Sequence, residues 1–256
     1  MVDPTERFVE IVQQPAHDVA LDEAALLIAA HDHAVDVAEQ MGRLDALAVH
    51  APPNPEALAS YLFVEHGFTG NTVDYGEPEN SFLDVVLDRR LGIPITLSVL
   101  MMEVGRRAGV ALEGVGMPGH FLVRSEPGIF FDPFNGGERL DADGAHARFT
   151  AVQGDATFAP EFLEPVDAHA ILGRMLANLV RTLVSRAPAH ALWAVRLRLR
   201  VPGLSPSERR EIATLLGSLG QFAEAATELD AIAQDLDGDA AGRLGRDAAA
   251  YRARAN

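Results

Sequence analysis

The chain has 256 residues, enough for one large or two ordinary domains with a substantial buried core. Its 37 acidic and 21 basic residues give a net charge of −16, which argues against a nucleic-acid-binding or anionic-membrane surface, because such surfaces need clustered cations. All 21 cations are arginine, so lysine Schiff-base chemistry and a Walker-type phosphate loop are excluded. Cysteine is also absent, which excludes disulfides, thiolate metal sites and a cysteine nucleophile.

The first residues lack the basic and apolar regions of a signal peptide. The longest apolar stretch, residues 93–102, is about half of what a bilayer crossing needs. With the lack of cysteine, these features predict a cytoplasmic protein.

Apolar spacing predicts a helix over residues 21–47 and a short helix over 56–64, separated by the proline-rich segment 51–55. After turn-rich segments, a helix is expected from Leu83 to Arg90, with Asn80 or Ser81 as its N-terminal cap.

A further helix is expected to start at Pro94, a residue favoured at the first helical position, and to end at Gly109. Glu103 falls on what we expect to be the solvated face of this helix. Residues 110–117 read as extended, and strands are expected at 120–124 and 129–132 around a hairpin loop. A long helix that leads into an antiparallel hairpin indicates an α+β domain.

The composition changes after residue 165. Residues 171–200 carry six arginines and no acid, with apolar residues at helical spacing, and we expect the arginines to face the acidic first domain or solvent. A helical pair is expected over 206–236, where the spacing of Gly220, Phe222, Ala225 and Leu229 resembles one tetratricopeptide repeat.

His120 and Asp132 form the one pair with a mechanistic pattern, since an aspartate that holds a histidine fixes its tautomer and strengthens it as a base. If Ser125 to Pro127 form a three-residue loop, His120 lies directly opposite Asp132. A four-residue loop would place the two side chains on opposite faces of the sheet unless a bulge intervenes.

The sequence resembles the transglutaminase-like core of the papain-like superfamily, in a bacterial branch where tetratricopeptide-type helices follow the core. The resemblance covers residues 20 to 235 and rests on five motifs: Asn80-Ser81, Arg90-x-Gly92-Ile93-Pro94-Ile95-Thr96-Leu97, Pro118-Gly119-His120-Phe121-Leu122, Asp132-Pro133-Phe134-x-Gly136-Gly137 and Arg174-Met175-Leu176-x-Asn178-Leu179. It implies a transglutaminase-like domain over residues 1–165 and a helical tetratricopeptide-like domain over 166–256.

By this resemblance, His120 and Asp132 match the family's catalytic histidine and aspartate, while Pro94 falls where the family has its cysteine nucleophile. Proline has no nucleophilic atom, so crosslinking by the usual thiol route is ruled out. Thr96 is the nearest hydroxyl, placed either to cap the helix or to act as a nucleophile, and Ser98 is expected to bond to the helix carbonyl four residues earlier.

We therefore expect a non-catalytic or weakly catalytic protein that binds a protein or peptide partner. The alternative is a hydrolase or acyltransferase acting on amide or ester bonds, with His120 and Asp132 as the base pair and a hydroxyl or water as the nucleophile. No cofactor and no metal are expected, because His31 and His33, two residues apart on a helix, point in different directions.

Overall fold

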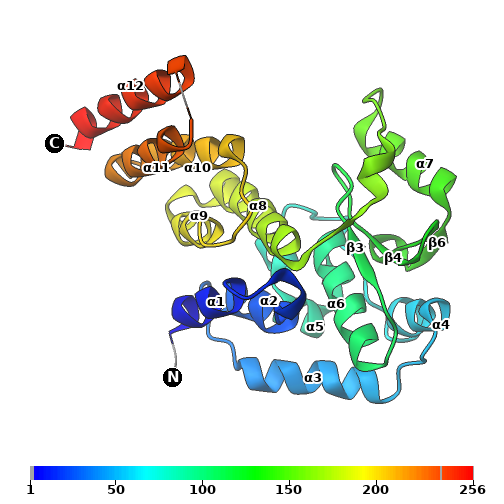
Figure 1. Ribbon diagram of the computed structural model, residues 1–256. Coiled ribbons are helices and arrows are strands. Elements are labelled where there is room, and N and C mark those ends of the chain that lie inside the picture. The colour runs from blue at the N-terminus through cyan, green and yellow to red at the C-terminus, as the bar shows by residue number, and fades with distance from the viewer. Residues whose placement is uncertain (1–2, 237, 256) are drawn as a thin grey trace. The chain divides into compact units, whose positions relative to one another are not determined.

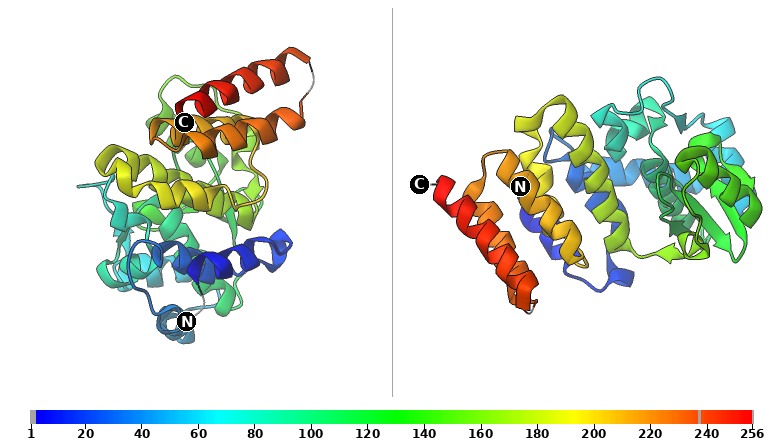
Figure 2. Two further views of the ribbon diagram at one scale, coloured as in Figure 1. Left: turned by 90° about the vertical axis from the view of Figure 1, so that its left-hand side faces the viewer. Right: turned by 90° about the horizontal axis from the view of Figure 1, so that it is seen from above.

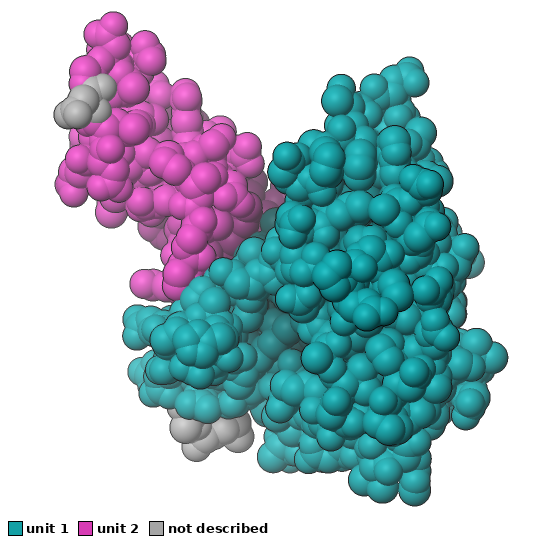
Figure 3. Space-filling model, turned by 45° about the vertical axis from the view of Figure 1, so that its right-hand side comes forward, with its two compact units in different colours: residues 1–179 teal, residues 180–256 magenta. Residues whose placement is uncertain are grey.

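The computed structural model describes residues 3–236 and 238–255, and these divide into two compact units, residues 1–179 and 180–256 (Figure 3). The division falls inside a long helix, α8 (Ala168–Arg186). Residue 166, the start of the tetratricopeptide-like part by resemblance, stays a prediction.

The first unit is built from α-helices with short 3₁₀- and π-helical segments between them (Figure 1). The α-helices are α1 (Pro4–Val12), α2 (Leu21–Ala29), α3 (Val37–Val49), α4 (Pro55–Ala59), α5 (Leu83–Arg89), α6 (Pro94–Arg107), α7 (Ala142–Gln153) and the start of α8. The short segments are η1 (Ala16–Asp18), the π-helix η2 (Ser60–Glu65), η3 (Pro78–Ser81), η4 (Pro133–Asn135) and η5 (Pro160–Leu163).

Two sheets complete this unit. A parallel pair joins β1 (Thr69–Gly70) to β2 (Leu91–Gly92). The larger sheet is antiparallel, in the order β6-β5-β4-β3-β7, and consists of β3 (Glu113–Val115), β4 (Leu122–Glu126), β5 (Ile129–Asp132), β6 (Glu138–Leu140) and β7 (Pro165–Val166). The observed helices and antiparallel sheet agree with the predicted α+β class.

Helix α6 organises the core of this unit. Pro94 occupies its first turn and Gly109 follows its end with φ 76°, as the sequence predicts. The helix packs against β3 and β4 of the sheet. On the sheet itself, Leu122 and Phe130 lie in a cluster with Ala145 and Phe149 of α7, so neighbouring side chains along each strand point to the opposite face.

Three local predictions were wrong. Residues 30–36 interrupt the helix expected over 21–47, which forms α2 and α3 instead. The N-terminal cap of α5 is Phe82, without a side-chain hydrogen bond, because Asn80 and Ser81 belong to η3. Glu103 is only 5% exposed, since arginines of its own helix cover its carboxylate.

The second unit consists of the end of α8, η6 (Pro188–His190), α9 (Leu192–Arg198), α10 (Pro206–Ser218), α11 (Phe222–Gln234) and α12 (Gly238–Ala255). Helices α10, α11 and α12 lie side by side (Figure 2). A Cβ at Gly217 of α10 would lie 2.3 Å from Cε1 of Tyr251, so only glycine allows α12 to approach this closely.

Two of the six arginines between residues 171 and 200 find acids within this second unit. Arg196 pairs with Glu224 at 2.5 Å, and Arg198 pairs with Glu208 at 3.1 Å. The observed partners of these two arginines are therefore acids of their own helical unit, which the expectation from the sequence did not include.

Candidate functional site

The hairpin of β4 and β5 brings His120 and Asp132 together, although its register differs from the expected one. The loop is the two-residue turn Pro127-Gly128, and a bulge between Arg124 and Glu126 shifts the pairing by one residue. His120 precedes β4, which begins at Leu122. Without the bulge, residues 120 and 132 would have pointed to opposite faces, because one residue of slip reverses every side chain.

Nε2 of His120 lies 2.9 Å from Oδ1 of Asp132, and both residues are buried, at 6% and 0% exposure. Asp132 also accepts hydrogen bonds from the backbone N–H of Asn135 at 3.3 Å and from its side-chain amide at 2.8 Å. Nε of Arg148, on α7, forms an ion pair with Oδ2 at 2.8 Å.

The pKa of Asp132 is lowered from its ordinary value. Burial raises this pKa, but the hydrogen bond and charge of His120, the Asn135 amide and the charge of Arg148 together outweigh burial. Asp132 is therefore a carboxylate built to stay ionised, which is what a group that orients a histidine requires.

His120 is fixed from the backbone side as well. The guanidinium of Arg174 donates to the carbonyls of Met117 and His120, the latter at 2.7 Å, and lies 5.5 Å from the ring centroid of Phe121. Because Asp132 engages Nε2, Nδ1 is the ring nitrogen left for a ligand, and it makes no hydrogen bond within residues 3–236 and 238–255.

A short series of aromatic rings leads from His120 toward the surface. The ring of Phe134, in η4, lies 6.1 Å from that of His120 and 5.8 Å from that of Tyr75, both edge to face. A Cβ on Gly70 would lie 2.5 Å from Phe134, and Gly70 pairs with Gly92, two residues before α6. Phe134 thus links His120 to the segment that precedes Pro94.

The hydroxyls at the start of α6 do not form a nucleophile–base pair with His120. The N-terminal cap of α6 is Ile93, so Thr96 does not cap the helix, contrary to one of its two expected roles. Thr96 is fully buried, and its Oγ1 has no hydrogen-bond partner. Ser98 donates to the carbonyl of Pro94 at 2.8 Å, as expected from its position in the helix.

Sequence reasoning missed Asn135 and Arg148 and gave Arg174 no role. Asn135 had a readable signal, since an amide three residues after an aspartate at the start of a turn is well placed to bond to it. Arg148 gave none, because residues 142–153 carry no clear apolar period and α7 was not predicted.

The two histidines considered as metal ligands have separate partners: His33 bonds to Asp84 at 2.7 Å, and His31 to the carbonyl of Leu27 at 2.7 Å. Among the described residues, no group of three or more histidine, aspartate or glutamate side chains is placed to hold a metal ion. The helices of the same residues include none that combines the length and apolarity needed to cross a bilayer.

A family model described as the transglutaminase-like superfamily matches residues 24–177. The chain belongs to this superfamily. It is 38% identical over 187 residues to a UPF0162 protein of Xylella fastidiosa (strain 9a5c), a match that covers 70% of this chain and 66% of the relative. It is 32% identical over 218 residues to the UPF0162 protein of Pseudomonas aeruginosa, covering 80% and 78%, so it also belongs with the UPF0162 proteins.

A more distant similarity, 38% identity over 96 residues, relates the transglutaminase-like chain to the F-box only protein 21 of Mus musculus and covers 33% of this chain and 15% of the relative. The chain spans about half to two thirds of the length of the first three UPF0162 relatives, at 66%, 48% and 49%. No solved structure matches it.

Proposed function

We propose that the chain is a non-catalytic or weakly catalytic transglutaminase-like protein that binds a protein or peptide partner. One observation carries the proposal: the His120–Asp132 pair is buried and fully oriented, while the 256 residues contain no cysteine and α6 begins with Pro94. Without a nucleophile to activate, His120 can still form a hydrogen bond to a bound ligand.

The surface next to His120 supports binding of an extended, partly apolar segment. Val73 is 98% exposed and Tyr75 is 46% exposed, on a loop that turns back beside η4. Asn71 holds this loop by accepting from the backbone N–H groups of residues 73 and 74, and it donates to Asn80 at 3.0 Å. The exposed apolar side chains of Val73 and Tyr75, on a loop that Asn71 holds in place, favour contact with a partner.

The helical second unit fits the same proposal. We infer that residues 166–256 form a tetratricopeptide-like module, a type of repeat that presents a binding face made of stacked helices. The close approach of α12 at Gly217 and the small residues Ala225 and Ala226, both buried in α11, support this inference.

Selection of displayed random peptides against the full chain tests the proposal. We expect enriched peptides with apolar or aromatic side chains, and a loss of affinity of about tenfold or more in the variant Val73→Asp. Val49→Asp is the matched control, because Val49 is also an exposed valine, at 74%, and belongs to helix α3 instead of this loop. Failure to enrich any sequence, or equal losses in both variants, would contradict the proposal.

A hydrolase or acyltransferase is the second candidate, and the buried, oriented pair of His120 and Asp132 favours it. Here His120 is the base, Asp132 orients it, and Thr96 or water attacks an ester or amide. A fluorophosphonate probe followed by intact-mass measurement separates the two candidates. We expect no adduct; an adduct that disappears in both Thr96→Val and His120→Gln would establish the enzyme.

A further inference from the structure

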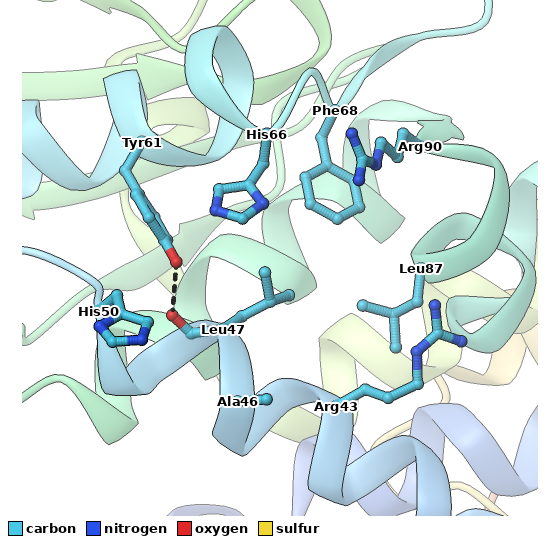
Figure 4. Close-up of a pocket in the computed structure, with 9 residues that line it drawn as sticks. All are labelled: Arg43, Ala46, Leu47, His50, Tyr61, His66, Phe68, Leu87 and Arg90. Atoms are coloured by element: carbon cyan, nitrogen blue, oxygen red, sulfur yellow. Dashed lines mark hydrogen bonds between the residues drawn. The ribbon is translucent and has the colours of Figure 1, made fainter.

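A cavity of about 600 Å³ lies in the first unit between α3 and the segment that runs from η2 to Phe68 (Figure 4). Its volume is in the range of small-molecule sites. Its lining consists of Arg43, Ala46, Leu47, His50, Tyr61, His66, Phe68, Leu87 and Arg90. Neither His120 nor Asp132 contributes to it, so the binding surface proposed above does not account for this cavity.

The lining combines an apolar floor with a cationic edge. Phe68 and Leu87 are buried, at 2% and 5% exposure, and Tyr61 donates its hydroxyl to the carbonyl of Leu47 at 3.0 Å, which leaves its ring as an apolar wall. The remaining polar side chains are two arginines and two histidines. None of the lining residues is acidic, although the chain has 37 acids and a net charge of −16.

Arg90 is the most informative of these residues. Its φ is 58°, in the left-handed region where glycine is the usual residue at a helix end, because a side chain there is strained. Its guanidinium makes no hydrogen bond or ion pair in the part of the chain that the structure describes. Arg43, in contrast, pairs with Asp88 at 2.6 Å. Arg90 is thus an uncompensated cation at the edge of an apolar cavity.

We propose that this cavity binds a small organic acid, with an apolar body of about the size of one aromatic ring between Phe68 and Leu87 and a carboxylate or phosphate on the guanidinium of Arg90. Arginine suits both anions because its planar guanidinium can donate two parallel N–H hydrogen bonds to two oxygens of a carboxylate or phosphate. His50 and His66, which also line the cavity, add N–H donors, and no acid of the lining repels the anion.

Isothermal titration with phenyl phosphate, benzoate, inorganic phosphate and benzyl alcohol tests the proposal. We expect one of the two aromatic anions to bind at least tenfold more tightly than inorganic phosphate and than the neutral alcohol, and the preferred anion tells phosphate from carboxylate. Arg90→Gln should weaken that binding about tenfold or more. Arg246→Gln, at an exposed residue of α12, removes the same charge and should leave it unchanged.

A second variant keeps the test independent of charge. Ala46 is an exposed position of α3 that lines the cavity, so Ala46→Trp should fold and fill part of the cavity. We expect it to abolish binding of the aromatic anion. The proposal is overturned if the wild-type chain binds neither aromatic anion, if Arg90→Gln and Arg246→Gln lose affinity equally, or if Ala46→Trp binds as the wild type does.

Discussion

Two buried carboxyl groups of the first unit both lie beside arginine side chains, and yet their pKa values are shifted in opposite directions. In the Asp132 cluster (His120, Asp132, Asn135 and Arg148) the pKa of the carboxyl is lowered. In the Glu103 cluster (Asp22, Glu103, Arg106 and Arg107) burial raises the pKa of Glu103 to about 7. Both carboxyls are nearly inaccessible, at 0% and 5% exposure, so burial alone does not explain the difference.

The difference lies in how many acids share the donors. Asp132 has the donors of His120 and Asn135 to itself. Glu103 accepts from Arg106 at 2.9 Å and from Arg107 at 3.1 Å, but the same two arginines also bond to Asp22, at 3.0 and 2.6 Å. After burial, the charge of Asp22 is the main cause that raises the pKa of Glu103. Where two buried acids share the same arginines, the pKa of one, Asp22, is lowered, while that of the other, Glu103, is raised.

Asp132→Ala should have the largest effect of the changes considered for these clusters. It leaves His120 and Asn135 without their acceptor and Arg148 without one of its two ion-pair partners. Breaking such a buried pair costs about 3–5 kcal/mol in the free energy of unfolding. Urea denaturation of the wild type and the variant near pH 7 measures this loss in the free energy of unfolding.

Asp132→Asn is the matched control, because the amide oxygen can still accept a hydrogen bond although the negative charge is removed. We expect it to lower the free energy of unfolding by less than Asp132→Ala does. The lowered pKa of Asp132 also means that its contribution is present above its ordinary value of 3.8 and is lost as the pH falls through the folded value. A loss below about 1 kcal/mol in Asp132→Ala would contradict the structural role of the pair.

Glu103→Gln should raise the free energy of unfolding at neutral and higher pH, by less than Asp132→Ala lowers it. The folded chain holds the Glu103 proton up to a pKa of about 7, compared with 4.5 in the unfolded chain, so the free energy of unfolding falls as the pH rises between these values. The amide removes this dependence. We expect the variant to match the wild type near pH 4.5 and to exceed it by on the order of 2 kcal/mol near pH 8.

Chemical denaturation at a series of pH values measures this profile. Glu65→Gln, at an exposed residue, should keep the wild-type slope. If Glu103→Gln is less stable than the wild type near pH 8, the ion pairs with Arg106 and Arg107 outweigh burial, and the contrast between the two clusters disappears.

The sequence predicted α6 and β5 closely because their signals are local: a proline at the first turn, a glycine past the end, and a β-rich run bounded by turn residues. It also singled out His120 and Asp132, which the structure brings to 2.9 Å. The bulge in β4 and the burial of Glu103 were not predictable in this way. The burial of Glu103 involves residues far apart in the chain, because the two arginines that bond to it also bond to Asp22. The bulge lies within the hairpin itself, and no residue pattern marked its position.

Thr96 is another buried polar residue of this unit, and unlike Asp132 and Glu103 it has no hydrogen-bond partner. We expect the smallest change in the free energy of unfolding here. Its hydroxyl is fully buried without a hydrogen bond, and an unsatisfied hydroxyl in such a place costs about 1 kcal/mol or more. Thr96→Val keeps the shape and removes that cost, so the free energy of unfolding should rise by about 1 kcal/mol. Ser98→Val is the contrast, because it removes a hydroxyl that does bond to Pro94, and it should lower stability. A destabilised Thr96→Val would mean that this hydroxyl has a partner in solution, as the hydrolase alternative requires of a nucleophile next to its base.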